Sequence, residues 1–121
     1  MINQKIFKKW FRALESGKYR KCKGALHKDN NTFCAWGVLC DIYAKEKKEE
    51  WNLLNTHKTI LGESDSPPHK ILKWAGIPDA LDFVDTVIDL NDDKGYSFKR
   101  IVKTIKEKYL PILKLQKDIE V

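Results

Sequence analysis

The sequence lacks long apolar runs. Nowhere do about 18 apolar residues stand together, as a membrane-spanning helix requires, and residues 1–9 contain no apolar core of the kind found in secretory signals. We therefore expect a soluble protein that stays in the cytoplasm, without a membrane partner. Cysteines are also few, and their odd number, three, argues for reduced thiols rather than a disulfide framework. Cys22, Cys34 and Cys40 are expected to be buried as small hydrophobic side chains.

Prolines are scarce as well, with four in 121 residues, and no low-complexity tract or internal repeat is present. Together with the 42% hydrophobic and 11% aromatic content, this excludes a mainly disordered chain. The length fits one hydrophobic core, and no linker interrupts the pattern. We expect a single domain over residues 1–121 with a heavily charged surface.

The motifs of common nucleotide and metal chemistry are missing. Neither G-x-G-x-x-G nor G-x-x-x-x-G-K-[ST] occurs, which argues against nucleotide hydrolysis of the usual kinds. Four possible zinc ligands lie close together in the sequence, namely Cys22, His27, Cys34 and Cys40. They are separated by four, six and five residues, whereas structural zinc sites use close pairs of ligands, so the spacing argues against a zinc site. No local pattern favours a cysteine or histidine nucleophile. We expect no enzymatic activity, no cofactor and no metal.

The residues from Asp89 onward also do not fit the pattern of a calcium-binding loop. Its sixth position, which needs glycine for a sharp turn, is Lys94, and its twelfth, which needs a bidentate glutamate, is Arg100. The segment is better explained as a turn that leads into a helix.

Charge is distributed in blocks along the chain. Residues 1–28 hold nine Lys/Arg and one acid, residues 79–93 hold six Asp and no base, and residues 94–121 hold eight Lys/Arg and three acids. The basic ends either meet the acidic segment in the fold or attract an anionic partner such as phosphate, nucleotide or nucleic acid.

Apolar spacing predicts three main helices. The first spans residues 3–16, with Asn3 as N-cap and Gly17 just past its end. A second follows Gly37, and the longest begins after Ser97. Pro111 lacks the amide hydrogen of an inner helical turn, so this last helix should kink or end near Tyr109.

Shorter elements fill the rest of the chain. Residues 19–27 and 32–35 are expected to pair as a hairpin, whereas residues 51–61 fit a second hairpin or a strand and a loop. A short helix should start at Ser66-Pro67 and stop at Gly76 and Pro78, and residues 83–88 fit a strand or a short helix. The predicted fold is α+β, a small antiparallel sheet packed with three or four helices and ending in a long C-terminal helix.

Two basic segments are the candidates for anion binding. Residues 18–23 interleave Tyr19 with four cations, and Lys99, Arg100 and Lys103 crowd the start of the last helix, where free N–H groups also favour phosphate. An acidic neighbour such as Asp92 explains the second cluster equally well.

Aromatic and amide side chains could complete such a site. Phe83 and Trp74 can stack on a base, and Asn91 can bind a ribose or a base edge. The simpler alternatives are a core position for Phe83 and a turn position for Asn91. Trp10 lies on the apolar face of the first helix and should be core, while Trp74 is expected to be partly exposed.

Two motifs follow each other along the chain: W-x-x-A-L-x-S-G-K-Y and then C-x-x-G-V-L-C-D-x-Y. In this order of motifs the chain resembles a family of small bacteriophage proteins. The resemblance extends to Trp74-Ala75-Gly76-Ile77, to Leu90-Asn91-Asp92 and to Ser97-Phe98, and so covers nearly the whole chain. The chain departs from the family in having Ala35 where a second adjacent cysteine is usual and Arg20-Lys21 where a glutamine is common.

Within that group the chain is most similar to the Thoeris anti-defence proteins, which sequester cyclic ADP-ribose signals and in some cases cyclic oligonucleotides. The resemblance implies a non-catalytic homo-oligomer built on dimers, with ligand pockets at a subunit interface. On this basis Arg20, Lys23 and Arg100 are expected to hold phosphates, Phe83 or Trp74 to stack on the base, and Asn91 to bind ribose or base.

Two other functions fit the same sequence. The chain could be a basic nucleic-acid-binding protein of the early phage programme, because positive charge lies at both ends. It could also inhibit a host enzyme by covering it with Trp74 and its apolar neighbours.

Overall fold

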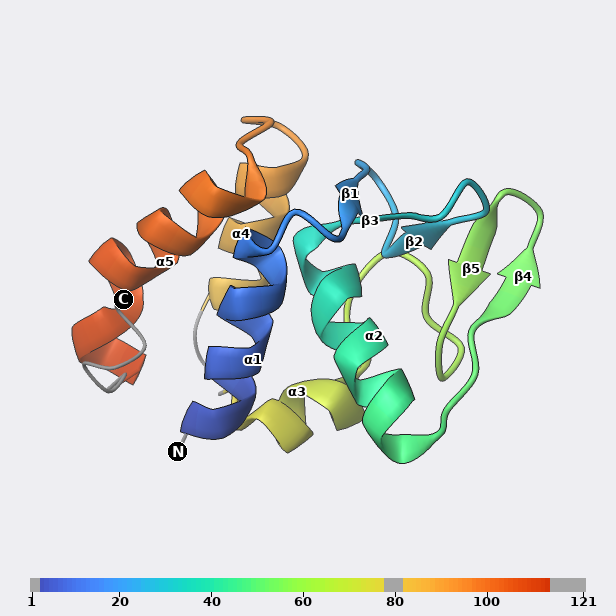
Figure 1. The fold of residues 1–121 in the computed structure, drawn as a ribbon, viewed down its shortest axis with the longest axis horizontal. Helices are drawn as coiled ribbons and strands as arrows, with labels where there is room; N and C mark the ends of the chain where they lie inside the picture. The colour runs from blue at the N-terminus through green and yellow to red at the C-terminus, as the bar shows by residue number, and fades with distance from the viewer. Residues whose placement is uncertain (1–2, 78–81, 114–121) are drawn as a thin grey trace.

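The computed structural model describes residues 3–77 and 82–113, without the side chains of residues 110–113. As predicted, the fold is α+β, with five helices and one small five-stranded sheet in the described residues (Figure 1). The helices are α1 (Gln4–Glu15), α2 (Ala35–Lys47), α3 (His69–Ala75), α4 (Phe83–Asn91) and α5 (Phe98–Leu113). The strands are β1 (Arg20–Lys21), β2 (His27–Lys28), β3 (Thr32–Phe33), β4 (Asn52–Leu54) and β5 (His57–Thr59).

Helix α1 forms where the apolar spacing predicted it. The Asn3 side-chain oxygen accepts a hydrogen bond from the Ile6 N–H at 3.2 Å, which satisfies one of the free amides of the first turn. Gly17, at φ +79°, adopts the left-handed conformation just beyond the helix. One face of the helix is buried, and its residues are Ile6, Phe7, Trp10, Phe11 and Leu14.

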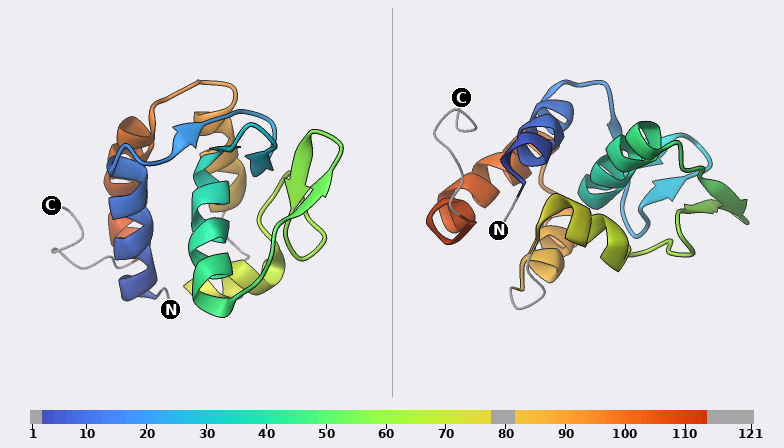
Figure 2. Two further views of the ribbon diagram at one scale, coloured as in Figure 1. Left: turned by 45° about the vertical axis from the view of Figure 1, so that its right-hand side comes forward. Right: turned by 90° about the horizontal axis from the view of Figure 1, so that it is seen from below.

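Helix α2 begins at Ala35, two residues before Gly37, whereas the prediction placed its start after Gly37. Cys34 is its N-cap, and the sulfur accepts a hydrogen bond from the Gly37 N–H at 3.3 Å. The helix ends at Lys47, and its C-cap residue, Lys48, has a φ of +55°. It lies between α1 and the sheet in all three ribbon views (Figures 1 and 2). Side chains on opposite faces of α2 therefore reach the helical core and the sheet.

The sheet has the strand order β1-β3-β2-β5-β4. Three of its pairings are antiparallel, but β1 runs parallel to β3. The predicted hairpin of residues 19–27 with 32–35 is therefore only partly correct, because the antiparallel pair is β2 with β3 across a turn containing Asn31 at φ +62°. Residues 51–61 form the hairpin β4–β5, with Asn55 at φ +61° in its turn.

Two further elements differ from or refine the predictions. Residues 83–88 belong to helix α4, so the strand alternative is wrong. Helix α3 begins at His69 rather than at Pro67, and Gly76 ends it with φ +73°; Pro78 lies outside the described residues.

Helix α5 begins as predicted. The Ser97 hydroxyl oxygen accepts a hydrogen bond from the Arg100 N–H at 3.2 Å, as expected for an N-cap. The helix includes Pro111, so it extends past the point near Tyr109 where the proline was expected to act.

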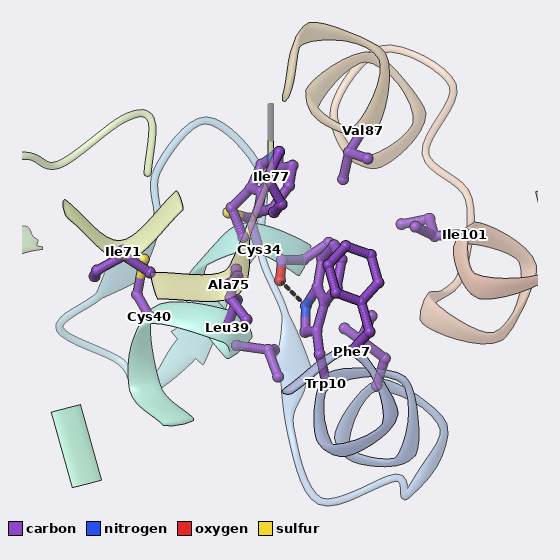
Figure 3. Close-up of a cluster of buried hydrophobic side chains, with 14 of the residues drawn as sticks. Phe7, Trp10, Cys34, Leu39, Cys40, Ile71, Ala75, Ile77, Val87 and Ile101 are labelled. Atoms are coloured by element: carbon purple, nitrogen blue, oxygen red, sulfur yellow. Dashed lines mark hydrogen bonds between the residues drawn. The ribbon is translucent and has the colours of Figure 1, made fainter. Parts of the chain in front are cut away.

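The core is an aromatic cluster between α1, α2 and α4. Trp10 stacks on Trp36 at 4.9 Å between ring centroids, and Phe83 meets both indoles edge-on. The Trp10 indole N–H donates to the Ala35 carbonyl at 2.9 Å, shown as a dashed line in Figure 3. The Trp36 indole donates to the Val84 carbonyl at 3.1 Å. Each buried indole thus keeps a partner for its N–H, which burial would otherwise make costly.

Candidate functional site

A hollow of about 340 Å³ opens where the segment leading into β1 meets the sheet and α2. Eight residues line it: Lys18, Tyr19, Arg20, His27, Asn31, Phe33, Asp41 and Lys45. They come from the chain around β1, from β2 and β3 with the turn between them, and from one face of α2. We call this site the β1 hollow.

Asp41 is the polar centre of the β1 hollow. Its side chain is buried, yet both carboxylate oxygens are hydrogen-bonded: the Tyr19 hydroxyl donates to Oδ2 at 2.7 Å and the Trp51 indole to Oδ1 at 3.1 Å. Lys45 Nζ lies 3.1 Å from Oδ2, one helical turn along α2. Donors from three segments therefore hold the carboxylate in one orientation.

These contacts set the charge state of the two donors that titrate. Burial, and then the Asp41 carboxylate, raise the pKa of the Tyr19 hydroxyl. The hydrogen bond to Asp41 raises the pKa of Lys45. At neutral pH the hollow thus contains a protonated phenol and an ammonium group.

Stacked rings form one wall of the β1 hollow. His27 stacks on Phe33 with 3.7 Å between ring centroids, and Tyr19 meets Phe33 edge-on at 5.0 Å. His27 Nε2 lies 3.4 Å from the Asn31 side-chain oxygen, whereas Nδ1 is buried with no hydrogen-bond partner among the described residues. Burial, and then Lys58, lower the pKa of His27, so the imidazole is neutral at pH 7.

The formal charge of the β1 hollow is positive. Lys18, Arg20 and Lys45 contribute three positive charges against the single carboxylate of Asp41. Lys18 and Arg20 are exposed at its rim, where a ligand can reach them. A small anion with about two negative charges would balance the site.

A larger groove of about 990 Å³ runs between α4 and α5. Asp85 and Asp89 of α4 line it opposite Lys99 and Lys103 of α5. The lining of this groove contains five cations and four carboxylates, so its formal charge is +1, whereas that of the β1 hollow is +2. The smaller β1 hollow is therefore the more positive of the two sites and the better candidate for an anion.

The thiols offer no activated nucleophile. Burial raises the pKa of Cys34 to about 12 and that of Cys40 well above its ordinary value, and it also raises the pKa of Cys22. Cys34 and Cys40 are buried as predicted, whereas Cys22 is only half-buried. Within residues 3–77 and 82–113, no three His, Cys, Asp or Glu side chains are grouped as metal ligands.

A family model described as "Domain of unknown function (DUF8296)" matches residues 2–109, which include the whole β1 hollow. The chain belongs to this family. No curated protein and no solved structure matches the chain. In the part of the chain that the structure describes, no helix combines the length and apolar character needed to cross a membrane.

The three cations predicted to hold phosphate do not converge. Arg20 lines the β1 hollow, whereas Arg100 lines the α4–α5 groove and stacks over the Tyr96 ring at 3.7 Å. Lys23 is exposed, and its ammonium lies beside Gly95 in the loop between α4 and α5. The prediction of one cavity shared by these cations is therefore wrong within a subunit.

Phe83 and Asn91 have structural positions instead of ligand positions. Phe83 is fully buried in the aromatic core, so neither face of its ring is free to stack on a base. Asn91 is 1% exposed and its amide is used inside the fold: Oδ1 accepts from the Ala35 N–H at 3.1 Å and Nδ2 donates to the Cys22 carbonyl at 2.9 Å. The alternative of a core ring is correct for Phe83, and Asn91 ends α4 as a buried structural amide.

Trp74 is partly exposed, as predicted. It packs edge-on against Tyr43 at 5.1 Å and lines neither the β1 hollow nor the α4–α5 groove. It therefore does not join Arg20 in a common site.

Sequence reasoning missed the most informative residue of the β1 hollow, Asp41. A signal was present, because Asp41 is the only acid in the otherwise apolar segment 38–44 of a predicted helix. A lone carboxylate on a buried helical face needs hydrogen-bond donors. Lys45, four residues later, was a predictable partner at the i, i+4 spacing.

Proposed function

We propose that this protein binds a cyclic nucleotide immune signal, a cyclic ADP-ribose isomer or a cyclic oligonucleotide, and sequesters it without degrading it. In this role it is a phage anti-defence protein that acts in the cytoplasm of the infected bacterium. The observation that carries the proposal is the β1 hollow, where three cations and aromatic rings surround one buried carboxylate.

The β1 hollow supports each part of such a ligand. Lys18 and Arg20, exposed at the rim, can form charge-assisted hydrogen bonds with phosphate oxygens. Tyr19 is only half-buried, and the Lys45 ammonium lies over its ring at 5.7 Å from the centroid; a base that displaces this ammonium can stack there. The volume of about 340 Å³ lies at the lower end of the range of small-molecule pockets, so part of the ligand would remain outside a single subunit.

A second subunit would enclose that remainder, and we propose a homo-oligomer built on dimers. Strand β4, at one edge of the sheet formed by the described residues, supports the dimer because Leu53 and Leu54 are 63% and 62% exposed there. This edge is opposite to β1, so it supports the association of subunits and not the enclosure of the ligand. Apolar side chains on an unpaired edge are typical of strands that pair with another chain.

Binding without turnover is supported by the chemistry of the hollow. Its one hydroxyl group with an activating neighbour is that of Tyr19, but burial and Asp41 raise the pKa of this phenol and keep it protonated. The cysteines lie outside the lining of the hollow, and burial raises their pKa values.

The proposal is tested by calorimetric titration with cyclic ADP-ribose isomers, followed by heating of the complex and mass spectrometry of the released ligand. We expect a submicromolar dissociation constant, about −8 kcal/mol, and an intact ligand. Arg20→Ala should weaken binding at least tenfold, whereas Arg12→Ala, exposed on α1 outside the hollow, should not. Weak binding by the wild type, or a chemically altered ligand, would contradict the proposal.

One observation favours nucleic-acid binding as a second candidate. The strand register places five residues in one row across the sheet: Arg20, Thr32, Lys28, His57 and Leu54. Arg20 and Lys28 could contact successive phosphates of a single strand. Binding of this kind falls steeply with salt, because each neutralised phosphate releases counterions, whereas binding of one small dianion loses much less.

A further inference from the structure

We infer that the β1 hollow selects a ligand with a free ribose hydroxyl near its phosphate, and that Asp41 is the residue that determines this specificity. The inference rests on the proposed function and names the part of the ligand that the buried carboxylate binds. The reasons are the hydrogen-bonding capacity of Asp41, its burial and the positive charges around it.

Asp41 has acceptor capacity left for a ligand. An ionised carboxylate offers about four lone-pair sites, and three are used by the Tyr19 hydroxyl, the Trp51 indole and the Lys45 ammonium. Lys45 is 73% exposed, and ion pairs of such side chains contribute little to stability. The ammonium can therefore give way to a ligand hydroxyl, which leaves one or two acceptor sites facing the hollow.

The carboxylate also decides which part of the ligand it contacts. A phosphate placed against Asp41 would be repelled, so the anionic group must bind at the rim, near Lys18 and Arg20. A neutral donor must then face Asp41. Ribose hydroxyls are neutral donors held within a few bonds of the phosphate, which suits a hollow of about 340 Å³. The amino group of a base is attached farther from the phosphate.

Asp41 is held ready for this contact. Tyr19 and Trp51 donate to different oxygens of the carboxylate, so its plane is fixed before a ligand arrives. A site built to hydrogen-bond a hydroxyl rejects an analogue that lacks it, because an analogue that displaces the Lys45 ammonium without offering a hydroxyl leaves the buried acceptor without that partner. Tyr19 and Trp51 act here as positioning residues.

The test is an equilibrium titration of the full wild-type chain with three probes: ADP, 2′,3′-dideoxy-ADP and inosine diphosphate. We expect ADP to bind at least tenfold more tightly than the dideoxy analogue and within threefold of inosine diphosphate. Equal binding of ADP and its dideoxy analogue overturns the inference and leaves the proposed function standing. If only inosine diphosphate binds more weakly than ADP, the inference is also overturned, since a base edge would then face Asp41.

Variants assign the selectivity to one side chain. Asp41→Asn should reduce the preference for ADP over the dideoxy analogue to less than threefold, and Glu46→Gln, exposed on the same helix, should preserve it. If Asp41→Asn prefers ADP over the dideoxy analogue as strongly as the wild type does, the assignment of the selectivity to Asp41 is overturned. If that variant fails to fold, the three probes on the wild type still decide. Binding of none of them overturns this inference, whereas the proposed function is decided by the titration with cyclic ADP-ribose isomers.

Discussion

Asn91 joins three segments of the chain through one buried amide. Its side chain accepts from the Ala35 N–H at the start of α2 and donates to the Cys22 carbonyl and to Asp92. Its own carbonyl accepts from Lys21 Nζ at 2.7 Å. One residue at the end of α4 therefore fixes β1 and α2 relative to each other, and the β1 hollow depends on that placement.

Asn91→Ala should destabilise the fold strongly. The substitution leaves the Ala35 N–H and the Cys22 carbonyl without their partner, and we expect a loss of about 3 kcal/mol in the free energy of unfolding, measured by urea denaturation. Asn52→Ala, exposed on β4, is the matched control and should stay within about 0.5 kcal/mol of the wild type. Equal effects of the two substitutions would contradict this role of Asn91.

His27 makes stability depend on pH. Burial and Lys58 lower its pKa, while Asn31 and Asp41 oppose the shift. The unfolded histidine takes up a proton below pH 6.5 that the folded one does not. Its contribution is therefore fully present above pH 6.5 and is lost as the pH falls through that value toward the lowered pKa.

His27→Phe should remove this dependence. The wild type is expected to lose up to about 1.4 kcal/mol per pH unit below 6.5 through this residue, whereas the variant keeps the stack on Phe33 and has no buried imidazole nitrogen to leave unpaired. Urea denaturation at pH 7 and pH 5 measures the difference. The same loss of stability in both proteins would show that His27 is not its source.

At the scale of elements, α2 approaches the segment before β2 very closely. A Cβ atom on Gly37 would lie 1.8 Å from the Leu26 carbonyl oxygen, a backbone atom that cannot turn aside. This contact sets the distance between the helix that carries Asp41 and the strand that carries His27. The width of the β1 hollow depends on it.

Gly37→Ala should be costly although alanine favours helices by about 1 kcal/mol over glycine. The clash with Leu26 forces α2 away from the sheet, and we expect a loss of about 3 kcal/mol, measured by urea denaturation. Gly17→Ala provides the comparison: apart from its two chain neighbours, no atom of the described residues lies within 4 Å of the added Cβ, so only the strain of φ +79° remains, about 1–2 kcal/mol. A Gly37→Ala protein as stable as the wild type would contradict the contact.

The elements differ in how far the sequence predicts them. Helix α1 follows from its apolar spacing and the Asn3 cap, because both signals are local. The two-residue strands are too short to show an alternating pattern, so the parallel pairing of β1 with β3 could not be predicted. The β-branched residues of 83–88 lie in a helix because Phe83, Val87 and Leu90 pack on the core at helical spacing.

The types of residue in the candidate site could be predicted from the sequence, but not which distant residues form it. Cations and rings near residues 18–20 follow from composition, and the β1 hollow contains Lys18, Tyr19 and Arg20. Which distant residues join them depends on tertiary packing. That packing brings in Asp41 of α2 and places Asn91 in the core.

At the scale of the whole molecule, the fold explains most of the division of the chain into basic and acidic blocks. The acidic segment forms the α4 wall of the α4–α5 groove and faces cations of α5, so these two blocks offset each other. The basic N-terminal block has no such acidic wall at the β1 hollow, where Asp41 is the single lining acid. An anionic ligand is therefore expected there rather than in the larger groove.

The most direct test of this account is the indole region of an NMR spectrum of the 14.1 kDa protein during titration with a cyclic ADP-ribose isomer. The Trp51 indole N–H donates to Asp41, whereas those of Trp10 and Trp36 donate to backbone carbonyls in the core. The account predicts that the Trp51 signal shifts with ligand while the Trp10 and Trp36 signals stay in place. An unchanged Trp51 signal at saturating ligand would contradict it.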